Sequence, residues 1–234
     1  MGKRVLIKLS GEALGLNGRL FDFAQIDRVA DVLVDLSKGG TQIALVIGAG
    51  NIWRGRQGPA ASMTAVNADH MGMLGTAINA IAMMDVLCRR GLRAHVLSAV
   101  DIPRFCEPYS QRLALSYLEQ GEVVIFACGT GNPFFSTDTA AALRAVEIGA
   151  DSILLAKNVD GVYDCDPVLH PEAVLLRDLT YDEVIARDLK VMDAAAILIC
   201  KEQKVPAIRV FALDDPRNIL KVVDGDPMGT VVHP

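Results

Sequence analysis

The sequence contains few cysteines, and none of them occurs in a metal-binding pattern. Its 234 residues include five cysteines without a Cys-x-x-Cys pair, and four histidines that show no ligand spacing. Cys88, Cys128 and Cys200 lie in apolar runs, where a free thiol behaves as a small hydrophobic group. We therefore expect no structural metal, and a reducing, cytoplasmic compartment.

A strong positive charge is also missing, and we expect neither a signal peptide nor a membrane span. The formal net charge is −5, which argues against nucleic acid as the main partner, because phosphate-tracking surfaces are strongly basic. The N-terminal apolar run is interrupted at Lys8, so it does not predict a signal peptide. The apolar stretch that starts at Met71 contains Asn79 and Asp85 and is too short for a membrane span. We expect a buried helix there, and no membrane partner.

Three common catalytic motifs are absent. The chain has no Walker A loop, no Gly-x-Ser-x-Gly elbow and no His-Glu-x-x-His pair. P-loop, serine-hydrolase and zinc-protease chemistry therefore have no support. Hydrophobic residues make up 51% of the chain. This is enough to build a full core, either as one α/β domain or as two small lobes.

Six apolar runs predict the strands of a central sheet. Most of them are continuously apolar rather than alternating, which is typical of parallel strands covered on both faces. Helical patterns lie between them, so we predict an α/β fold, a three-layer αβα sandwich with a mostly parallel central sheet. The predicted strands are 4–10, 42–48, 94–99, 123–128, 152–157 and 207–211, and the predicted helices are 23–38, 65–89, 109–120, 138–148, 192–203 and 216–223.

The boundaries of these elements carry further signals. Asp22 is a plausible N-cap of the first helix, and Thr137 and Asp138 offer caps for the helix that follows them. Residues 161–180 show no clear period, and we expect a short hairpin followed by a loop, which is a candidate lid. No repeat or linker is visible, so residues 1–234 are expected to form a single domain.

The first strand predicts a site at its carboxyl end, where ligands gather in open parallel sheets. It delivers Lys8, Ser10 and Gly11 within "KLSGEAL". A buried lysine without a partner would cost several kcal/mol, so Lys8 needs a carboxylate or an anionic ligand. The alternative is that Lys8 snorkels from an edge strand.

Two further strand ends carry glycine-rich turns. In "VIGAGNIWRG", the amides of Gly48 to Asn51 could converge on an anion, and Arg54 follows with a fork geometry that suits phosphate. This turn lacks the third glycine of the dinucleotide fingerprint, and Trp53 is interpreted as a surface or interface anchor. In "GTGNPFFSTDTAA", from Gly129, the start of the next helix favours an anion. Asp138 lies there too, so a nearby lysine or other cation is expected. A lysine, an arginine and glycine turns at adjacent strand ends suit phosphoryl transfer.

Six strings in order and spacing extend this interpretation to the whole chain: "KLSGEAL", "VIGAGNIWRG", "ADHMGML", "GTGNPFFSTDTAA", "NVDGVYDCDP" and "LKVMDAAA". Together they resemble the amino acid kinase family, and within it the members that phosphorylate UMP. The resemblance implies the amino acid kinase fold, with residues 1–150 mainly a UMP-binding lobe and 151–234 mainly an ATP-binding lobe. It also implies transfer of the ATP γ-phosphate to UMP with Mg²⁺ held through nucleotide phosphates, and no covalent intermediate. A homohexamer, inhibition by UTP and activation by GTP are implied as well.

The resemblance also implies roles for individual residues. Lys8 would lie between the donor and acceptor phosphates, and Asp193 would orient it. Arg54 would hold the UMP phosphate and the transferring group, Asp138 would act on the phosphate or metal side, and Asp69 would accept hydrogen bonds from the ribose. The residues expected to bind ATP are Lys8, Leu9, Ser10, Gly11, Gly50, Arg54, Lys157, Tyr163 and Asp166. Those expected to bind UMP are Ala49, Asp69, Thr130, Gly131, Asn132, Pro133, Phe134, Phe135, Ser136 and Thr137.

Some departures and alternatives stay open at this point. Ala49 stands where the family commonly has glycine, so one amide of that turn could be displaced. Lys157 could contact ATP or be solvated, and the GTP positions do not match clearly around residues 84–95. A carboxylate or carbamate acceptor, which needs no Asp69, is one alternative. A nucleotide-binding storage or sensor protein without turnover is another, although Lys8 and Asp193 argue against it.

Overall fold

A central sheet of parallel strands organises the computed structural model, which describes residues 2–15, 19–53 and 62–234. Within the described residues, its nine strands run in the order β4-β3-β5-β2-β1-β6-β10-β11-β9. All neighbouring pairs are parallel except β10 and β11. The strands are β1 (Arg4–Leu9), β2 (Gln42–Ile47), β3 (Ala94–Ser98), β4 (Glu107–Pro108), β5 (Val123–Ala127), β6 (Ser152–Lys157), β9 (Asp178–Thr180), β10 (Ile208–Ala212) and β11 (Thr230–His233).

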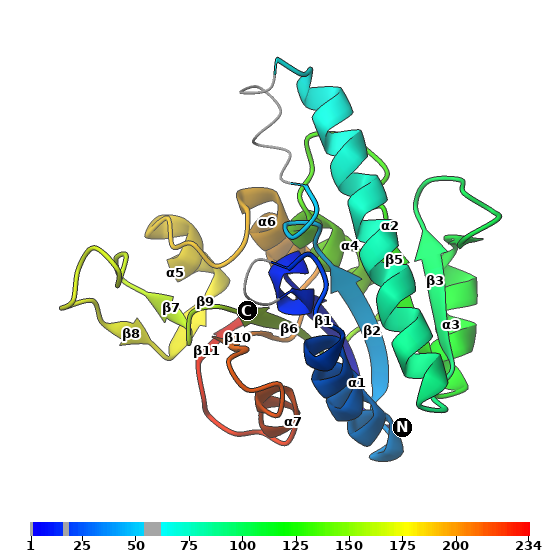
Figure 1. The fold of residues 1–234 in the computed structure, drawn as a ribbon. Helices are drawn as coiled ribbons and strands as arrows, with labels where there is room; N and C mark the ends of the chain where they lie inside the picture. Colours follow the sequence, from blue (N-terminus) through cyan, green and yellow to red (C-terminus); the bar gives the residue numbers. More distant parts are fainter. Residues whose placement is uncertain (1, 16–18, 54–61) are drawn as a thin grey trace.

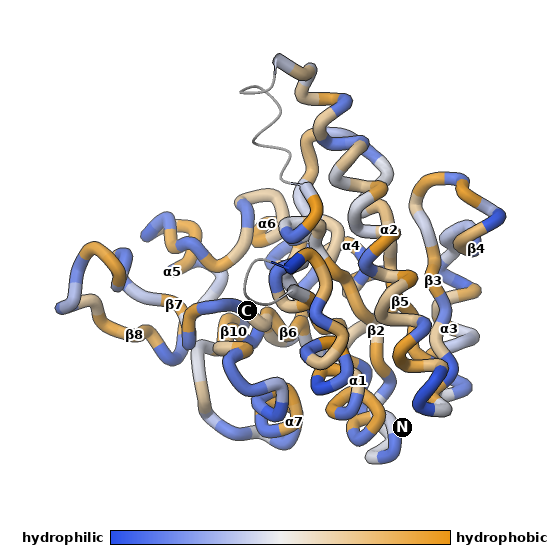
Figure 2. Tube along the Cα trace, in the orientation of Figure 1, coloured by the Kyte–Doolittle hydropathy of each residue, from blue (hydrophilic) through white to orange (hydrophobic). Residues whose placement is uncertain are grey.

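Helices cover both faces of this sheet and make three layers (Figure 1). One face packs against α1 (Phe23–Lys38), α2 (Ala65–Arg89) and α7 (Asn218–Val223). The other packs against α3 (Gln111–Glu119), α4 (Thr137–Ile148), α5 (Tyr181–Ala186) and α6 (Ala194–Glu202). The tube of α1 in Figure 2 alternates between apolar and polar colours, as a helix does when one side faces the core. The predicted three-layer α/β sandwich is confirmed.

The sequence predicted the longer strands and helices and missed the short ones. All six predicted strands are present with ends within one residue, and all six predicted helices are present. Asp22 caps α1, with its Oδ1 accepting the Gln25 N–H at 3.1 Å. The predicted caps of α4 are wrong, because Ser136 is the N-cap and its hydroxyl accepts the N–H groups of Asp138 and Thr139. The carboxylate of Asp138 is thereby left for another partner.

The segment without a clear period is partly as expected. A hairpin of β7 (Val162–Tyr163) and β8 (Leu175–Leu176) projects beside α5 (Figure 1). The following residues are not only loop, since β9 joins the main sheet beside β11 and α5 begins at a capping box on Thr180. These pieces of three and six residues are too short to show a period in the sequence.

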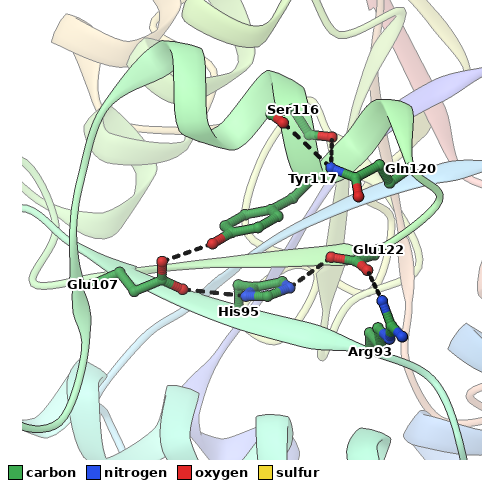
Figure 3. Close-up of polar contacts among 7 residues, drawn as sticks. All are labelled: Arg93, His95, Glu107, Ser116, Tyr117, Gln120 and Glu122. Carbon is green, nitrogen blue, oxygen red and sulfur yellow. Dashed lines mark hydrogen bonds and ion pairs between the residues drawn. The ribbon is translucent and has the colours of Figure 1, made fainter.

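A polar cluster stabilises the edge of the sheet at β3 and β4 (Figure 3). The His95 ring nitrogens lie 3.2 Å from Glu107 and 2.7 Å from Glu122, and its ring stacks on Tyr117 with centroids 3.5 Å apart. Tyr117 donates to the other oxygen of Glu107 at 2.7 Å, and Arg93 donates to Glu122 at 3.0 Å. The cluster therefore connects β3, β4, α3 and the start of β5.

Helix α2 is the one described helix that is long and apolar enough to span a membrane by length and composition, so the expectation that this stretch is too short for a span is wrong. Half of its most apolar stretch is buried inside the protein. It packs on β3, β5 and α1, as expected for a core helix. Its outward side is nevertheless apolar, with Met71, Leu74 and Ile78 exposed by 39%, 51% and 49%. The prediction of a buried helix therefore holds for only part of its circumference.

Candidate active site

Lys8 and Asp138 form an ion pair at the carboxyl end of the sheet. Lys8 Nζ lies 2.6 Å from Asp138 Oδ1, and the two side chains are only 14% and 19% exposed. Lys8 is on β1, which pairs with β2 on one side and β6 on the other. The alternative of an edge-strand lysine is therefore wrong. Asp138 reaches Lys8 because α4 begins beside β1 and Ser136 does the capping.

Asp193 is not the partner of Lys8, so that prediction is wrong. Its Oδ1 accepts the Ala196 N–H at 2.8 Å and caps α6, while its Oδ2 accepts the hydroxyls of Ser136 and Thr139, the latter at 2.7 Å. Burial alone would raise the pKa of Asp193, but the hydrogen bonds from Ser136, from the Ala196 N–H and from Thr139 hold it below its ordinary value. Asp193 therefore ties the start of α6 to the start of α4, which carries Asp138.

Lys157 brings a second ammonium group to the same place. It is at the end of β6, and its Nζ donates to the Val191 carbonyl. Burial lowers its pKa, while Asp138 raises it and Lys8 lowers it, so the three side chains interact electrostatically. Two lysines around one carboxylate leave an excess of positive charge when all are ionised. Such a place favours a bound anion.

The glycine turn after β2 is held from α2. Asn79 of α2 is fully buried, and its Nδ2 donates to the Gly48 carbonyl at 2.7 Å and to Asn51 Oδ1 at 2.8 Å. Gly11 packs so closely on this turn that a Cβ there would lie 2.6 Å from the Gly48 carbonyl oxygen. Ala49 does not adopt the left-handed backbone that favours glycine, so alanine fits the turn. The strand ends that carry Lys8 and Gly48 are thus adjacent.

A pocket of about 570 Å³ opens between this turn, α2 and the loop after β5. Asp69 of α2 forms one side, and its Oδ2 accepts the Phe134 N–H at 2.8 Å. The loop after β5 contains four residues with positive φ, namely Cys128, Gly129, Gly131 and Phe134. Of the residues predicted to bind UMP, the pocket is lined by Ala49, Asp69, Thr130, Asn132, Phe134, Phe135, Ser136 and Thr137.

A second pocket of about 630 Å³ lies on the other side of Ser136. Asp138 and Lys157 line it, together with residues 188–194 and parts of α5 and α6. Ser136, Asp193 and Ala194 line both pockets, so they form the boundary between them. The structure therefore has two neighbouring pockets, with the cluster of Lys8, Asp138 and Lys157 close to their junction.

Some predicted site residues lie apart from this junction. Tyr163 and Asp166 line a third pocket of about 310 Å³, which adjoins the second because Asp188, Leu189 and Lys190 line both. The Tyr163 hydroxyl donates to Asp160 at 2.7 Å, and Asp166 accepts the Val168 N–H at 2.9 Å. Leu9, Ser10 and Gly50 are at the strand ends near Lys8, and Gly131 and Pro133 are in the loop after β5. Arg54 lies outside the described residues.

Several pocket residues were not predicted from the sequence to line a binding site. Trp53 lines the first pocket, with its Nε1 donating to the Ala68 carbonyl at 2.9 Å, so it is not simply a surface anchor. Thr76 and Cys128 also line this pocket. Thr76 is a polar residue between apolar neighbours in α2, and this was the available signal. Val191 and Met192 in the second pocket give no such signal, because they are ordinary apolar residues.

A paired lysine and two adjoining pockets at the ends of parallel strands are what a phosphoryl transferase between two nucleotides needs. Residues 3–211 match the amino acid kinase family. The chain belongs to the amino acid kinase family. The match includes Lys8, Asp138, Lys157 and Asp193, so the junction of the two pockets lies inside the matched region.

Relatives and solved structures match this chain over nearly its full length. It is 48% identical over 232 residues to a uridylate kinase of Xanthomonas oryzae pv. oryzae, covering 99% of this chain and 96% of the relative. Its fold matches a UMP kinase structure from Bacillus anthracis with a TM-score of 0.94 and 35% identity, covering 99% and 96% of the two chains. A UMP kinase from Ureaplasma parvum also has a TM-score of 0.94 and 35% identity, with full coverage of both chains.

Proposed function

We propose that this member of the amino acid kinase family transfers the γ-phosphate of ATP to UMP, giving UDP and ADP. The observation that carries the proposal is the pair of pockets that meet at Ser136, Asp193 and Ala194 beside the ion pair of Lys8 with Asp138. The names of its relatives, uridylate kinase and UMP kinase, support the choice of acceptor.

UMP occupies the first pocket in this proposal. The carboxylate of Asp69 accepts hydrogen bonds from the ribose, and the loop of residues 130–137 surrounds the base through main-chain and hydroxyl groups. The turn at Ala49 faces the phosphate, and Arg54 remains the predicted phosphate clamp. Since most residues that line this pocket come from positions 49–139, the first 150 residues form mainly the acceptor side.

ATP occupies the second pocket, with its adenosine reaching toward Tyr163 and Asp166 in the third. Lys157 and the residues at the end of β1 then face the phosphate chain, and Lys8 lies where the two nucleotides meet. The ammonium of Lys8 offsets the charge that builds up on the transferring group. Transfer is in line and direct, without a covalent intermediate.

Kinases of this family use a divalent metal with ATP, and we propose Mg²⁺. The described residues contain no group of three or more His, Cys, Asp or Glu side chains suited to hold a metal. Mg²⁺ is commonly bound by one or two carboxylates together with substrate phosphates and water. The junction fits that pattern, since the carboxylate of Asp138 lines the second pocket and does not cap a helix. Mg²⁺ bound there would neutralise charge on the β- and γ-phosphates.

The exposed apolar side of α2 supports a homo-oligomer, and we propose the homohexamer that the family resemblance implies. Met71, Leu74 and Ile78 are spaced by three and four residues and therefore share one helix face. A face of this kind is covered when a second copy packs against it. Inhibition by UTP and activation by GTP belong to the same proposal.

Steady-state kinetics with ATP and a series of acceptors test the proposal. UMP should be phosphorylated with a much higher kcat/KM than CMP or dTMP, and chelation of Mg²⁺ should abolish turnover. The assay is repeated with UTP and with GTP to test regulation. Equal or absent activity on all three monophosphates, or activity on a carboxylate or carbamate instead, would contradict it.

A further inference from the structure

The loop that forms the acceptor pocket begins at a buried residue with strained backbone. Cys128 has a φ of +61°, in the left-handed region that residues with a side chain rarely adopt, and it is fully buried. Strand β5 ends at Ala127, so the N–H of Cys128 lies beyond the last residue of the strand. The Gly131 N–H donates to the Cys128 carbonyl at 2.9 Å. Together with Gly129, at φ +60°, Cys128 turns the chain back over the pocket.

The partner of the Cys128 N–H is the hydroxyl of Thr76. Thr76 is on α2, is 4% exposed, and accepts the Cys128 N–H at 2.8 Å. Its own proton is donated to the Met73 carbonyl at 2.6 Å. Both contacts of the hydroxyl are therefore within the protein, and its oxygen faces Cys128 as an acceptor. A strained residue of this kind persists only where its surroundings hold it.

We propose that Thr76 is a positioning residue for the acceptor: it holds Cys128 in the left-handed conformation, so that residues 129–136 take the shape that binds the nucleotide. The choice of UMP as that nucleotide rests on the proposed function. Without the hydroxyl, the buried Cys128 N–H has no partner within the protein. The backbone then relaxes toward water in the pocket, and Thr130 and Asn132 move with it.

The chain offers a matched control for this test. Thr230 is also fully buried, and its hydroxyl also accepts a backbone N–H, that of Val162 at 2.8 Å, and donates to a carbonyl, that of Leu176. It lies on β11, in contact with the hairpin and not with the acceptor pocket. Thr76→Val and Thr230→Val therefore remove the same chemistry from two different places.

The experiment compares the two variants with Thr76→Ser in kinetics and in amide hydrogen exchange. Thr76→Val should raise the KM for UMP by about tenfold or more and leave the KM for ATP within about twofold. Thr76→Ser should restore the wild-type KM, and Thr230→Val should lower Tm without changing the KM for UMP. The Cys128 amide should exchange faster in Thr76→Val and not in Thr230→Val.

An unchanged KM for UMP in folded Thr76→Val, or an unchanged exchange rate of the Cys128 amide, would overturn the proposal. If Thr76→Val does not fold, Thr76→Ala takes its place and should raise the same KM by about threefold or more; an unchanged KM there overturns the proposal equally. A wild-type enzyme that does not phosphorylate UMP refutes the proposed function instead. In that case, hydrogen exchange of the Cys128 amide is the measurement that tests the positioning role of Thr76.

Discussion

Lys8 Nζ lies 2.6 Å from Asp138 Oδ1, although the two residues are 130 positions apart and belong to β1 and α4. The pair fixes the ammonium group at the junction of the two pockets. Lys157 adds a second amino group there, and it interacts electrostatically with both Asp138 and Lys8. A nucleotide phosphate entering this place meets a lysine that is already oriented, which lowers the cost of ordering it during the reaction.

Lys8→Met should reduce kcat by about 10³-fold or more while the protein still folds, because the charge is used mainly in the transition state. The measurement is a single-turnover assay with ATP and UMP, together with a thermal melt. Lys201→Met is the control, since Lys201 forms an exposed ion pair with Asp182 away from the pockets. A loss smaller than tenfold for Lys8→Met contradicts the role given to this residue.

Asp193→Asn should lower the free energy of unfolding most at neutral pH. Hydrogen bonds hold the pKa of Asp193 below its ordinary value in the folded state. Its ionised form therefore stabilises the fold above the unfolded pKa of about 3.9, and this contribution is lost as the pH falls through the lower folded pKa. Urea unfolding of wild type and variant from about pH 7 to pH 3 should show a stability gap that closes at the acid end. A gap that is constant over this range would count against the network around Asp193.

Glu122→Gln tests the cluster at the sheet edge in the same way (Figure 3). The hydrogen bond from Arg93 lowers the pKa of Glu122, and His95 contributes in the same direction. The stabilisation is present above the unfolded pKa of about 4.3 and is lost below it. The difference in Tm between wild type and Glu122→Gln should therefore shrink as the pH falls below about 4. A difference that grows as the pH falls below about 4 would contradict this account.

Leu74→Lys and Ile78→Lys should break the proposed oligomer, because each places a charge in the exposed apolar face of α2. Size-exclusion chromatography with light scattering should show a smaller species at the same protein concentration. Val174→Lys, on the exposed hairpin, should keep the wild-type size. An oligomer of unchanged size in both α2 variants would place the interface elsewhere.

Much of the fold could be predicted because its strands are long and apolar. Each of the six predicted strands is five or six residues long and mostly hydrophobic, and glycine or a capping residue marks the ends of most helices. The short pieces, such as β9 and α5, contain too few residues for a period. They form because the main sheet offers β9 an edge beside β11 and because Thr180 and Glu183 make a capping box.

The sequence predicted which residues belong to the site, but not which carboxylate pairs with Lys8. Asp138 and Asp193 both lie at the start of a helix, and the sequence could not show which one reaches Lys8. The choice depends on Ser136, which caps α4 and leaves Asp138 free, whereas Asp193 caps α6 itself. Thr76 was missed for a different reason. Its partner is a backbone N–H on a distant strand end, and no sequence pattern reports that contact.

The most direct test is a crystal structure of the enzyme with UMP and a non-hydrolysable ATP analogue. The account predicts UMP in the first pocket, the analogue in the second, and Lys8 Nζ within about 3 Å of a phosphate oxygen of each nucleotide. Asp138 should remain next to that ammonium group. If Lys8 instead points away, with its Nζ farther than about 6 Å from both phosphate chains, the proposed mechanism is wrong.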